Sequence, residues 1–197
     1  MKNFGMVFGM RRKKCLMMRK ILFSLLFIFA AGAIQAQEIK WMTMNEALEA
    51  QKKEPRKIFM DAYTTWCGPC KMLDKNTFAN KKLAAYINKN YYPVKFNAEG
   101  TEVINYKEMT FTNPGFDAKR KGRNSAHQFS QAMQITGYPT LAFFDENGGL
   151  VQLLTGYRTA EDLEVFLKLF AKDDHKKLKS EDDWLAYVKN FKGEFAD

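Results

Sequence analysis

Residues 38–171 alternate between short apolar runs and amphipathic segments with helix-capping residues. The run at 57–63 is apolar and aromatic apart from Asp61, and its length suits a buried central strand. Thr43 and Glu46 form a capping-box pattern that opens a helix. The same criteria predict strands at 38–42, 57–63, 92–97, 140–144 and 150–154, and helices at 43–53, 67–77, 80–90, 125–135 and 159–171. This order indicates a single α/β domain.

Two segments depart from this pattern. Residues 98–124 lose periodicity and gain Gly, Pro, Asn and charge, so we expect an insertion that forms a long loop. Its basic cluster at 119–123 is expected to be solvated, with contact to an acidic partner as the alternative. A last helix is predicted at 180–191, and its apolar stripe is expected to pack on the domain, with a docking helix as the alternative. The stripe consists of Trp184, Leu185, Val188 and Phe191.

The first 36 residues have the composition of a signal peptide. Arg19 and Lys20 supply a basic segment, and residues 21–34 form an apolar run too short to cross a bilayer as a helix. Small residues follow, so we expect cleavage after Ala36, with Ala33 as a second candidate. Residues 1–17 precede the basic segment, and we interpret them as a misassigned start.

The net charge of the folded domain must be counted without this leader. The whole chain has a formal charge of +9, but the first 36 residues hold seven Lys or Arg and no acid, which leaves +2 for residues 37–197. A nearly balanced domain has no general basic face for nucleic acid. We therefore expect an exported, periplasmic protein with one domain over residues 37–197, no stable membrane span after cleavage and no nucleic-acid partner.

Cysteine usage narrows the chemistry. Cys15 would leave with the leader, so Cys67 and Cys70 are the cysteines of the mature chain, and two residues separate them. A closed zinc site needs four ligands, and His127 and His175 lie far away in the sequence without ligand-like spacing. We expect those histidines to be structural or surface residues. A dedicated redox pair with no cofactor and no metal is the interpretation that follows.

A Cys-Gly-Pro-Cys motif at 67–70 can carry thiol–disulfide exchange. The start of a helix offers N–H groups and partial positive charge to a thiolate, so Cys67 is expected to attack a substrate disulfide. Cys70 would then resolve the mixed disulfide. Gly68 allows close approach of the backbone and Pro69 fixes the turn into the helix. Trp66 gives the rim of the expected active site an apolar surface.

Asp61 is a candidate for proton transfer. It lies six residues before Cys67 in an otherwise apolar strand. Burial would raise the pKa of its carboxyl and make it a proton acceptor for Cys70. The alternative is a partly exposed acid on an edge strand.

Residues 61–71 closely resemble the active-site segment of thioredoxins. Further along the chain, Lys95 matches the lysine that the family brings beside its buried aspartate. Pro139 matches the cis proline that faces the disulfide, and Gly156 matches a glycine after the hairpin. The resemblance spans about residues 56–171.

The resemblance implies the thioredoxin fold, a central mixed β-sheet flanked by helices, here with the 98–124 insertion before the cis-proline loop and a C-terminal helical extension. It also implies a groove in which the backbone at Tyr138 binds an extended substrate peptide beside Trp66. For Lys95 an ordinary surface lysine is the alternative. The implied site comprises Cys67, Cys70, Asp61 and Lys95 for catalysis, with a redox disulfide between the cysteines, and Trp66, Gly68, Pro69, Gly137, Tyr138 and Pro139 for substrate binding.

Residues 76–95 look less like cytosolic thioredoxin and more like periplasmic relatives of the C-terminal domain of the transmembrane disulfide reductase. This implies a reductase of disulfides in exported proteins that a membrane electron donor keeps reduced. The Gly-Pro dipeptide favours reduction, since thioredoxin-type centres lie near about −270 mV and strong oxidants near about −120 mV. The alternatives are an oxidase or isomerase of the same fold, and a non-catalytic peptide-binding module.

Overall fold

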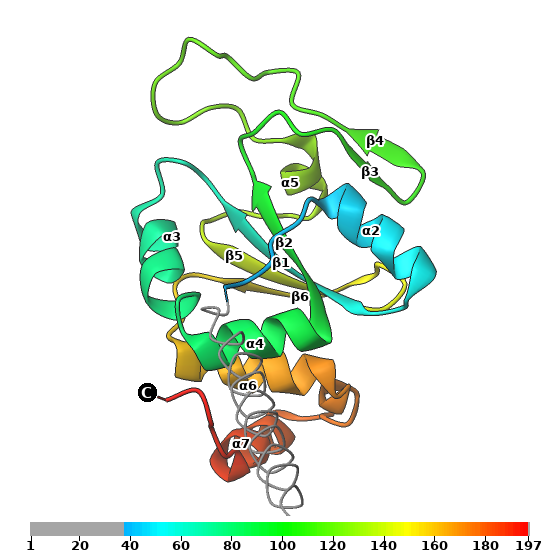
Figure 1. The fold of residues 1–197 in the computed structure, drawn as a ribbon, viewed down its shortest axis with the longest axis vertical. Helices are drawn as coiled ribbons and strands as arrows, with labels where there is room; N and C mark the ends of the chain where they lie inside the picture. Colours follow the sequence, from blue (N-terminus) through cyan, green and yellow to red (C-terminus); the bar gives the residue numbers. More distant parts are fainter. Residues whose placement is uncertain (1–37, 197) are drawn as a thin grey trace, which may run out of the picture. The chain divides into compact units, whose positions relative to one another are not determined.

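The computed structural model describes residues 38–196, so the predicted signal peptide lies outside the described residues. Helices and strands alternate along most of this range (Figure 1). In chain order they are α2 (Met44–Lys53), β1 (Lys57–Tyr63), α3 (Gly68–Met72), a π-helical turn (Leu73–Thr77), α4 (Lys81–Asn90), β2 (Tyr91–Asn97), β3 (Ile104–Tyr106), β4 (Met109–Phe111), α5 (Gln128–Ala132), β5 (Thr140–Phe144), β6 (Leu150–Thr155), α6 (Ala160–Ala171), a 3-10 turn (Asp174–Lys176) and α7 (Glu181–Asn190).

A four-stranded mixed sheet in the order β2-β1-β5-β6 forms the centre of the domain. Strand β1 pairs in parallel with β2 and antiparallel with β5, as β5 does with β6. In this register Ala62, near the end of β1, lies opposite Thr140, the first residue of β5. The segments that follow β1 and precede β5 therefore meet at one end of the sheet. Those segments contain the cysteine motif and Pro139.

Helices cover both faces of the sheet, with α4 and α6 on one face and α2 and α5 on the other (Figure 1). Because side chains alternate along a strand, Phe59 packs on the α4 and α6 side, whereas Ile58 and Met60 pack on the α2 and α5 side. Burial on both faces explains why β1 is apolar at nearly every position. The same alternation places Asp61 on the face of Phe59.

The predicted strand at 38–42 is wrong. Met42 forms a single parallel bridge with Val94, in which the Met42 N–H donates to the Pro93 carbonyl at 2.9 Å. A tight turn, closed by a hydrogen bond from the Trp41 N–H to the Ile39 carbonyl at 3.0 Å, interrupts the extended run. The apolar side chain of Ile39 is buried in the core without belonging to a strand.

The insertion at 98–124 is also more ordered than predicted. Strands β3 and β4 form a hairpin, and Ile104, Tyr106 and Phe111 are buried in the core under α2 and α5. Lys107 and Glu108 form its two-residue turn with φ of 49° and 62°. A tight hairpin turn of this kind usually carries Asn or Gly, so the sequence lacked the usual signal. The loop prediction holds for residues 98–103 and 112–124.

The last helix is confirmed, but its packing prediction holds for one side only. The Trp184 ring stacks on Phe166 of α6 with centroids 5.5 Å apart. Leu185 and Val188 are 56% and 40% exposed, so these two members of the predicted stripe lie outside the core. Helical spacing identified the apolar positions, but α7 contacts the domain along a narrower strip than they cover.

The chain after α7 returns to the domain. The buried carboxylate of Glu164, on α6, accepts the backbone N–H groups of Glu194 and Phe195 at 2.7 and 2.8 Å, and it pairs with Lys168 at 2.6 Å. The Phe195 side chain is buried, and the Asn80 amide donates to its carbonyl at 2.8 Å. These contacts fix the C-terminal tail against α4 and α6.

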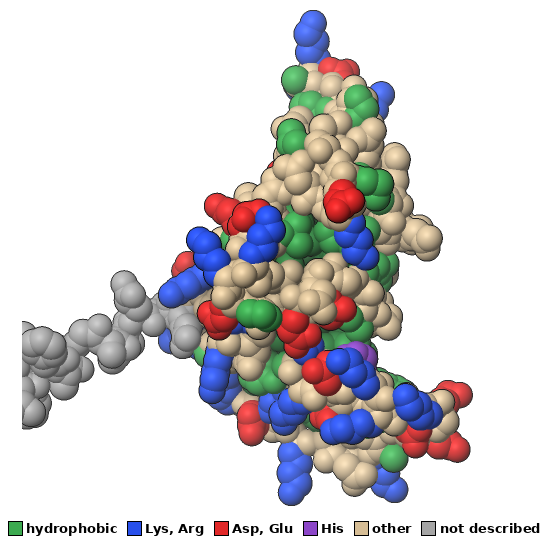
Figure 2. Space-filling view, turned by 90° about the vertical axis from the view of Figure 1, so that its right-hand side faces the viewer, with side chains coloured by type: hydrophobic (Ala, Val, Ile, Leu, Met, Phe, Trp, Pro, Cys, Tyr) green, Lys and Arg blue, Asp and Glu red, His purple; other side chains and the backbone are tan. Residues whose placement is uncertain are grey.

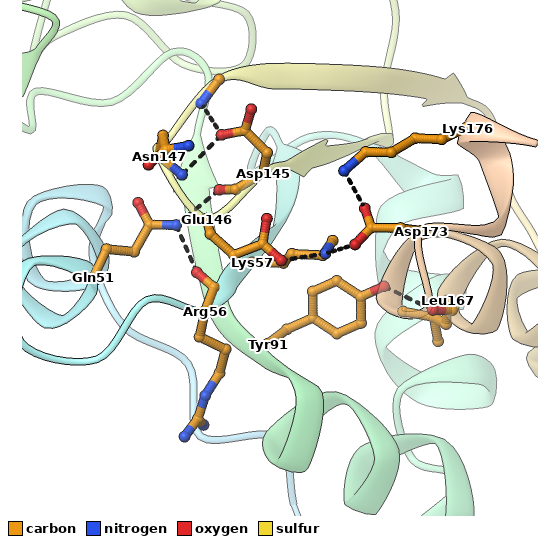
Figure 3. A network of polar contacts seen from close by, with 11 residues as sticks. Gln51, Arg56, Lys57, Tyr91, Asp145, Glu146, Asn147, Leu167, Asp173 and Lys176 are labelled. Carbon is orange, nitrogen blue, oxygen red and sulfur yellow. Dashed lines mark hydrogen bonds and ion pairs between the residues drawn. The ribbon is translucent and has the colours of Figure 1, made fainter.

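An ion network fixes the end of the sheet opposite the cysteine motif (Figure 3). Lys57, the first residue of β1, is nearly buried and its ammonium bonds to Glu146 in the β5–β6 turn and to Asp173 after α6, the latter at 3.0 Å. Gln51 donates to the carbonyl of Asp145 in the same turn at 2.9 Å. Buried charges of this kind need partners, and here the partners join three parts of the chain.

None of the helices between residues 38 and 196 combines the length and the apolar character that a membrane span requires. The face drawn in Figure 2 carries Lys, Arg, Asp and Glu side chains in a mixed arrangement, most densely at the lower end, where the C-terminal helices lie. This mixture agrees with the small net charge of residues 37–197.

His127 is a buried helix cap, which agrees with the structural role expected for it. Helix α5 is shorter than the predicted helix at 125–135, and His127 is its N-cap. The Nδ1 atom accepts the Phe129 N–H at 3.0 Å, so the ring is neutral and its Nε2–H donates to the Glu102 carbonyl at 2.7 Å. Burial lowers the pKa of His127, although the bond to Glu102 opposes this.

This cap predicts a pH-dependent stability. Because the pKa of His127 is lower in the folded protein, its stabilising contribution is complete above about pH 7 and is lost as the pH falls below the unfolded value of about 6.5. Asn also caps helices but does not titrate. We expect His127→Asn to cost about 1 kcal/mol of unfolding free energy at pH 7.5 and less at pH 5, measured by urea unfolding. An equal cost at both pH values would contradict a titrating cap.

Candidate active site

The cysteine motif lies at the junction between β1 and α3. Cys67 is the N-cap of α3, and its Sγ accepts the Cys70 N–H at 3.1 Å. The two cysteines form a disulfide with their Cα atoms 5.3 Å apart. When the disulfide is reduced, the same N–H favours a thiolate at Cys67 over a thiol. Cys67 is 2% exposed, so only a small part of its surface is open to a substrate sulfur.

Asp61 and Lys95 form a buried ion pair on adjacent strands. The register of β1 and β2 places them opposite each other, and the Lys95 Nζ lies 2.6 Å from the Asp61 Oδ2. Asp61 is fully buried on a central strand, which rules out the edge-strand alternative, and its Oδ1 has no hydrogen-bond partner. Burial raises the pKa of Asp61 to about 6, although Lys95 opposes this shift. An uncharged Asp61 is therefore accessible near neutral pH.

Lys95 is not an ordinary surface lysine. Its ammonium lies about 5 Å from the ring centroids of Trp41 (5.1 Å), Tyr63 (5.0 Å) and Phe78 (5.2 Å). Burial alone would lower the pKa of Lys95, but the carboxylates of Asp61 and Asp74 outweigh it and raise the pKa. The ammonium therefore stays charged.

Sequence reasoning missed Asp74. This half-exposed residue lies in the π-helical turn after α3, and its carboxylate binds the Lys95 ammonium. It therefore connects the buried Asp61–Lys95 pair to the surface. One signal was available, because Asp74 follows Cys70 by four residues, about one helical turn, and so lies on the same side of the helix.

The residues expected to bind substrate lie at the same end of the sheet. The Tyr138–Pro139 peptide bond is cis, and the Tyr138 ring packs edge-on against Trp66 with centroids 6.0 Å apart. The Gly156 N–H donates to the Pro139 carbonyl at 2.8 Å, and Gly156 has a φ of 97° that favours glycine. The Gly137 carbonyl accepts the Thr140 hydroxyl at 2.7 Å. Gly68 and Pro69 are exposed beside the disulfide.

The insertion contributes two residues to this rim: Glu99, which the sequence did not indicate, and Arg123 of the basic cluster at 119–123, whose contact with Trp66 was not expected. The Trp66 indole N–H donates to Glu99 at 2.7 Å, and the Arg123 guanidinium lies 4.4 Å from the Trp66 ring centroid. Glu99 and Arg123 lie near the two ends of the insertion and come together at the residue that precedes Cys67. Among the described residues no group of three or more His, Cys, Asp or Glu side chains could hold a metal ion.

The chain is similar to several known proteins. The profile of the thioredoxin-like domain family matches residues 44–171. The thiol:disulfide interchange protein DsbD of Pectobacterium atrosepticum is 25% identical over 130 residues, which cover 65% of this chain and 18% of DsbD. The thiol-disulfide oxidoreductase ResA of Geobacillus kaustophilus is 28% identical over 119 residues, which cover 56% of this chain and 61% of ResA. The match thus spans less than two thirds of the length of either relative.

A solved structure supports the fold. A thioredoxin-fold protein from Helicobacter pylori superposes with a TM-score of 0.54 at 15% sequence identity, covering 79% of this chain and 89% of that chain. At this identity the likeness concerns the fold, and it confirms the predicted fold class.

Proposed function

Because the chain belongs to the thioredoxin-like family, we propose that it is a thiol–disulfide oxidoreductase that reduces disulfides in exported proteins. The observation that carries this proposal is the Cys67–Cys70 disulfide next to β1, the strand that holds the buried Asp61–Lys95 pair. The names of DsbD and ResA, both thiol–disulfide enzymes, support it.

The reduction proceeds in two exchange steps. The Cys67 thiolate attacks one sulfur of the substrate disulfide, forms a mixed disulfide and expels the other substrate sulfur as a thiolate. Cys70 then loses its proton to the Asp61 carboxylate and attacks the Cys67 Sγ. This second step forms the Cys67–Cys70 disulfide and releases the remaining substrate thiolate. Two electrons have then passed from the protein to the substrate.

Lys95 and Asp74 support the proton step. Lys95 offsets the negative charge of Asp61, so that burial does not hold Asp61 permanently protonated. Asp74 holds the Lys95 ammonium from the solvent side. The proton received by Asp61 returns to solvent when the protein is reduced again.

Renewed reduction needs a dithiol donor. We propose that a membrane electron donor of the disulfide-reductase type supplies the two electrons in the periplasm, where disulfide-containing exported proteins are the substrates. The similarity to part of DsbD supports this assignment. Removal of residues 1–36 as a signal peptide would leave residues 37–197 as the working domain.

The redox potential of the Cys67–Cys70 pair tests the direction of transfer. We expect a value near about −270 mV when the purified protein is equilibrated with dithiothreitol or glutathione buffers, since reductases of this type lie there. A value near about −120 mV would instead indicate disulfide formation. Absence of a reversible couple would contradict the oxidoreductase proposal altogether.

A further inference from the structure

Residues at the two ends of the 98–124 insertion contact the side chain of Trp66, which directly precedes the nucleophile Cys67. Glu99 Oε2 accepts both the Trp66 indole N–H and the Asn124 N–H, each at 2.7 Å. From the other end of the insertion, Arg123 lies over the Trp66 ring at 4.4 Å. The Glu99–Trp66 hydrogen bond and the Arg123–Trp66 cation–π contact therefore attach the insertion to the rim of the active site, and the Glu99–Asn124 hydrogen bond joins the two ends of the insertion.

Arg123 keeps its hydrogen-bonding edge available. A guanidinium that stacks on an aromatic ring uses its face, while its N–H groups remain in the plane and can bind a carboxylate with two parallel hydrogen bonds. Arg123 is exposed, and within residues 38–196 no carboxylate pairs with it. Glu99 is engaged with Trp66 and Asn124.

The surrounding charges favour an acidic ligand. Residues 117–123 contain four Lys or Arg and one Asp, a net charge of +3. That Asp117 accepts the Lys119 backbone N–H at 2.9 Å, and all four cations are exposed. Arg123 places one end of this positive segment at Trp66, the residue before Cys67, where positive charge raises the local concentration of acidic peptides and repels basic ones.

We propose that Arg123 is a specificity-determining residue that binds an Asp or Glu side chain next to the reacting cysteine of the substrate protein. This assignment rests on the proposed reductase function and names its substrate class, which is proteins with acidic segments beside their disulfides. Tyr138 packs on Trp66 at 6.0 Å, so a peptide passing Tyr138 and Trp66 would reach Arg123 on the same rim.

The test compares two disulfide-bonded peptides that differ only in the residues flanking cysteine, Asp and Glu in one and Ser and Asn in the other. Arg123→Gln is expected to lower kcat/KM for the acidic peptide about tenfold, as the loss of one charge-assisted hydrogen-bond pair would, and to lower kcat/KM for the neutral peptide by a clearly smaller factor, because there only the contact with Trp66 is lost. The wild-type preference should shrink as the salt concentration rises. Equal losses on both peptides would show that Arg123 only supports Trp66 and would overturn the proposal.

Lys107→Asn is the matched control. Lys107 is an exposed cation in the β3–β4 turn of the same insertion, and it lies 5.3 Å from the Tyr106 ring instead of over Trp66. Its replacement removes the same charge, and Asn tolerates the positive φ of 49° found there. We expect it to change the preference for the acidic peptide less than twofold. A loss as large as that of Arg123→Gln would show that net charge alone sets the preference and would overturn the assignment to Arg123.

A binding measurement separates this inference from the proposed function. The same two peptides with Ser in place of Cys cannot react, and their affinities for wild type and Arg123→Gln can be measured by calorimetry. Arg123-dependent preference for the acidic peptide would support the inference even if neither cystine peptide were reduced, an outcome that would overturn the reductase proposal. Equal affinities for both peptides would overturn the inference even if both cystine peptides were reduced.

Discussion

Replacing Cys67 with serine is expected to reduce insulin-disulfide reduction to the uncatalysed background. A serine hydroxyl does not ionise near neutral pH and forms no mixed disulfide, so both exchange steps are lost. The fold should persist, since Ser differs from Cys by one atom. Turbidity of precipitating insulin with dithiothreitol as reductant measures the rate, and circular dichroism verifies the fold.

Cys70→Ser is the informative partner of this variant. It keeps the attacking thiolate and removes the resolving one, so we expect a mixed disulfide between Cys67 and the substrate to accumulate. Non-reducing gels would show it as a band that dithiothreitol removes. If Cys70→Ser formed no adduct while Cys67→Ser did, the assigned roles of the two cysteines would be reversed. If both variants kept wild-type partner binding and biological effect, the protein would be a peptide-binding module.

Asp61→Asn is expected to stabilise the protein and to slow its chemistry. Burial raises the pKa of Asp61 to about 6 in the folded protein, against an ordinary value of 3.8. The folded state therefore binds this proton more tightly, and stability falls as the pH rises from about 4 to above 6. Asn has no charge to bury, so the unfolding free energy should increase by about 2–3 kcal/mol at pH 8, with little difference at pH 4. Urea unfolding of the oxidised proteins at both pH values measures this effect.

The kinetic effect of the same variant should have the opposite sign. Without a proton acceptor on β1, Cys70 deprotonates more slowly, and we expect the resolution of the mixed disulfide to slow by about 10²-fold at pH 7. Stopped-flow tryptophan fluorescence after mixing reduced protein with a disulfide peptide follows this step. If Asp61→Asn were more stable but equally fast, Asp61 would be a buried charge without a role in proton transfer, and the proposed role would be contradicted.

Asp74→Asn is a useful comparison for both measurements. It removes the outer carboxylate on Lys95 and leaves the inner one in place. Since Asp74 is half exposed, its loss should change stability by less than about 1 kcal/mol. It should therefore not reproduce the pH dependence expected for Asp61→Asn.

The sequence predicted the site residues that lie on strands and in the Cys-Gly-Pro-Cys motif. Asp61 was expected to be buried because its neighbours in β1 are apolar, and a central strand buries both of its faces. The fold followed from the apolar runs of β1, β2, β5 and β6 and from the resemblance around the cysteines.

The residues that were missed contact the site through tertiary packing. Asp74 in the π-helical turn binds Lys95 on β2, and Glu99 and Arg123 contact Trp66 from the insertion. For Glu99 and Arg123 no local pattern reports these contacts, because they depend on how an irregular insertion returns to the domain. For Asp74 the four-residue spacing from Cys70 was the one available signal. The β3–β4 hairpin was missed for a related reason, since three-residue strands are too short to show a period and its turn is Lys107-Glu108.

The contacts of the C-terminal tail set the physical limits of the folding unit. The family profile ends at residue 171, the last residue of α6. The carboxylate of Glu164 nevertheless takes its backbone partners from Glu194 and Phe195, which also bury part of α4 and α6. A chain that stopped at the family boundary would expose apolar surface on those helices and leave a buried carboxylate without two of its donors. The smallest segment that can be excised as a stable domain therefore extends to Phe195, some two dozen residues beyond the end of the family match.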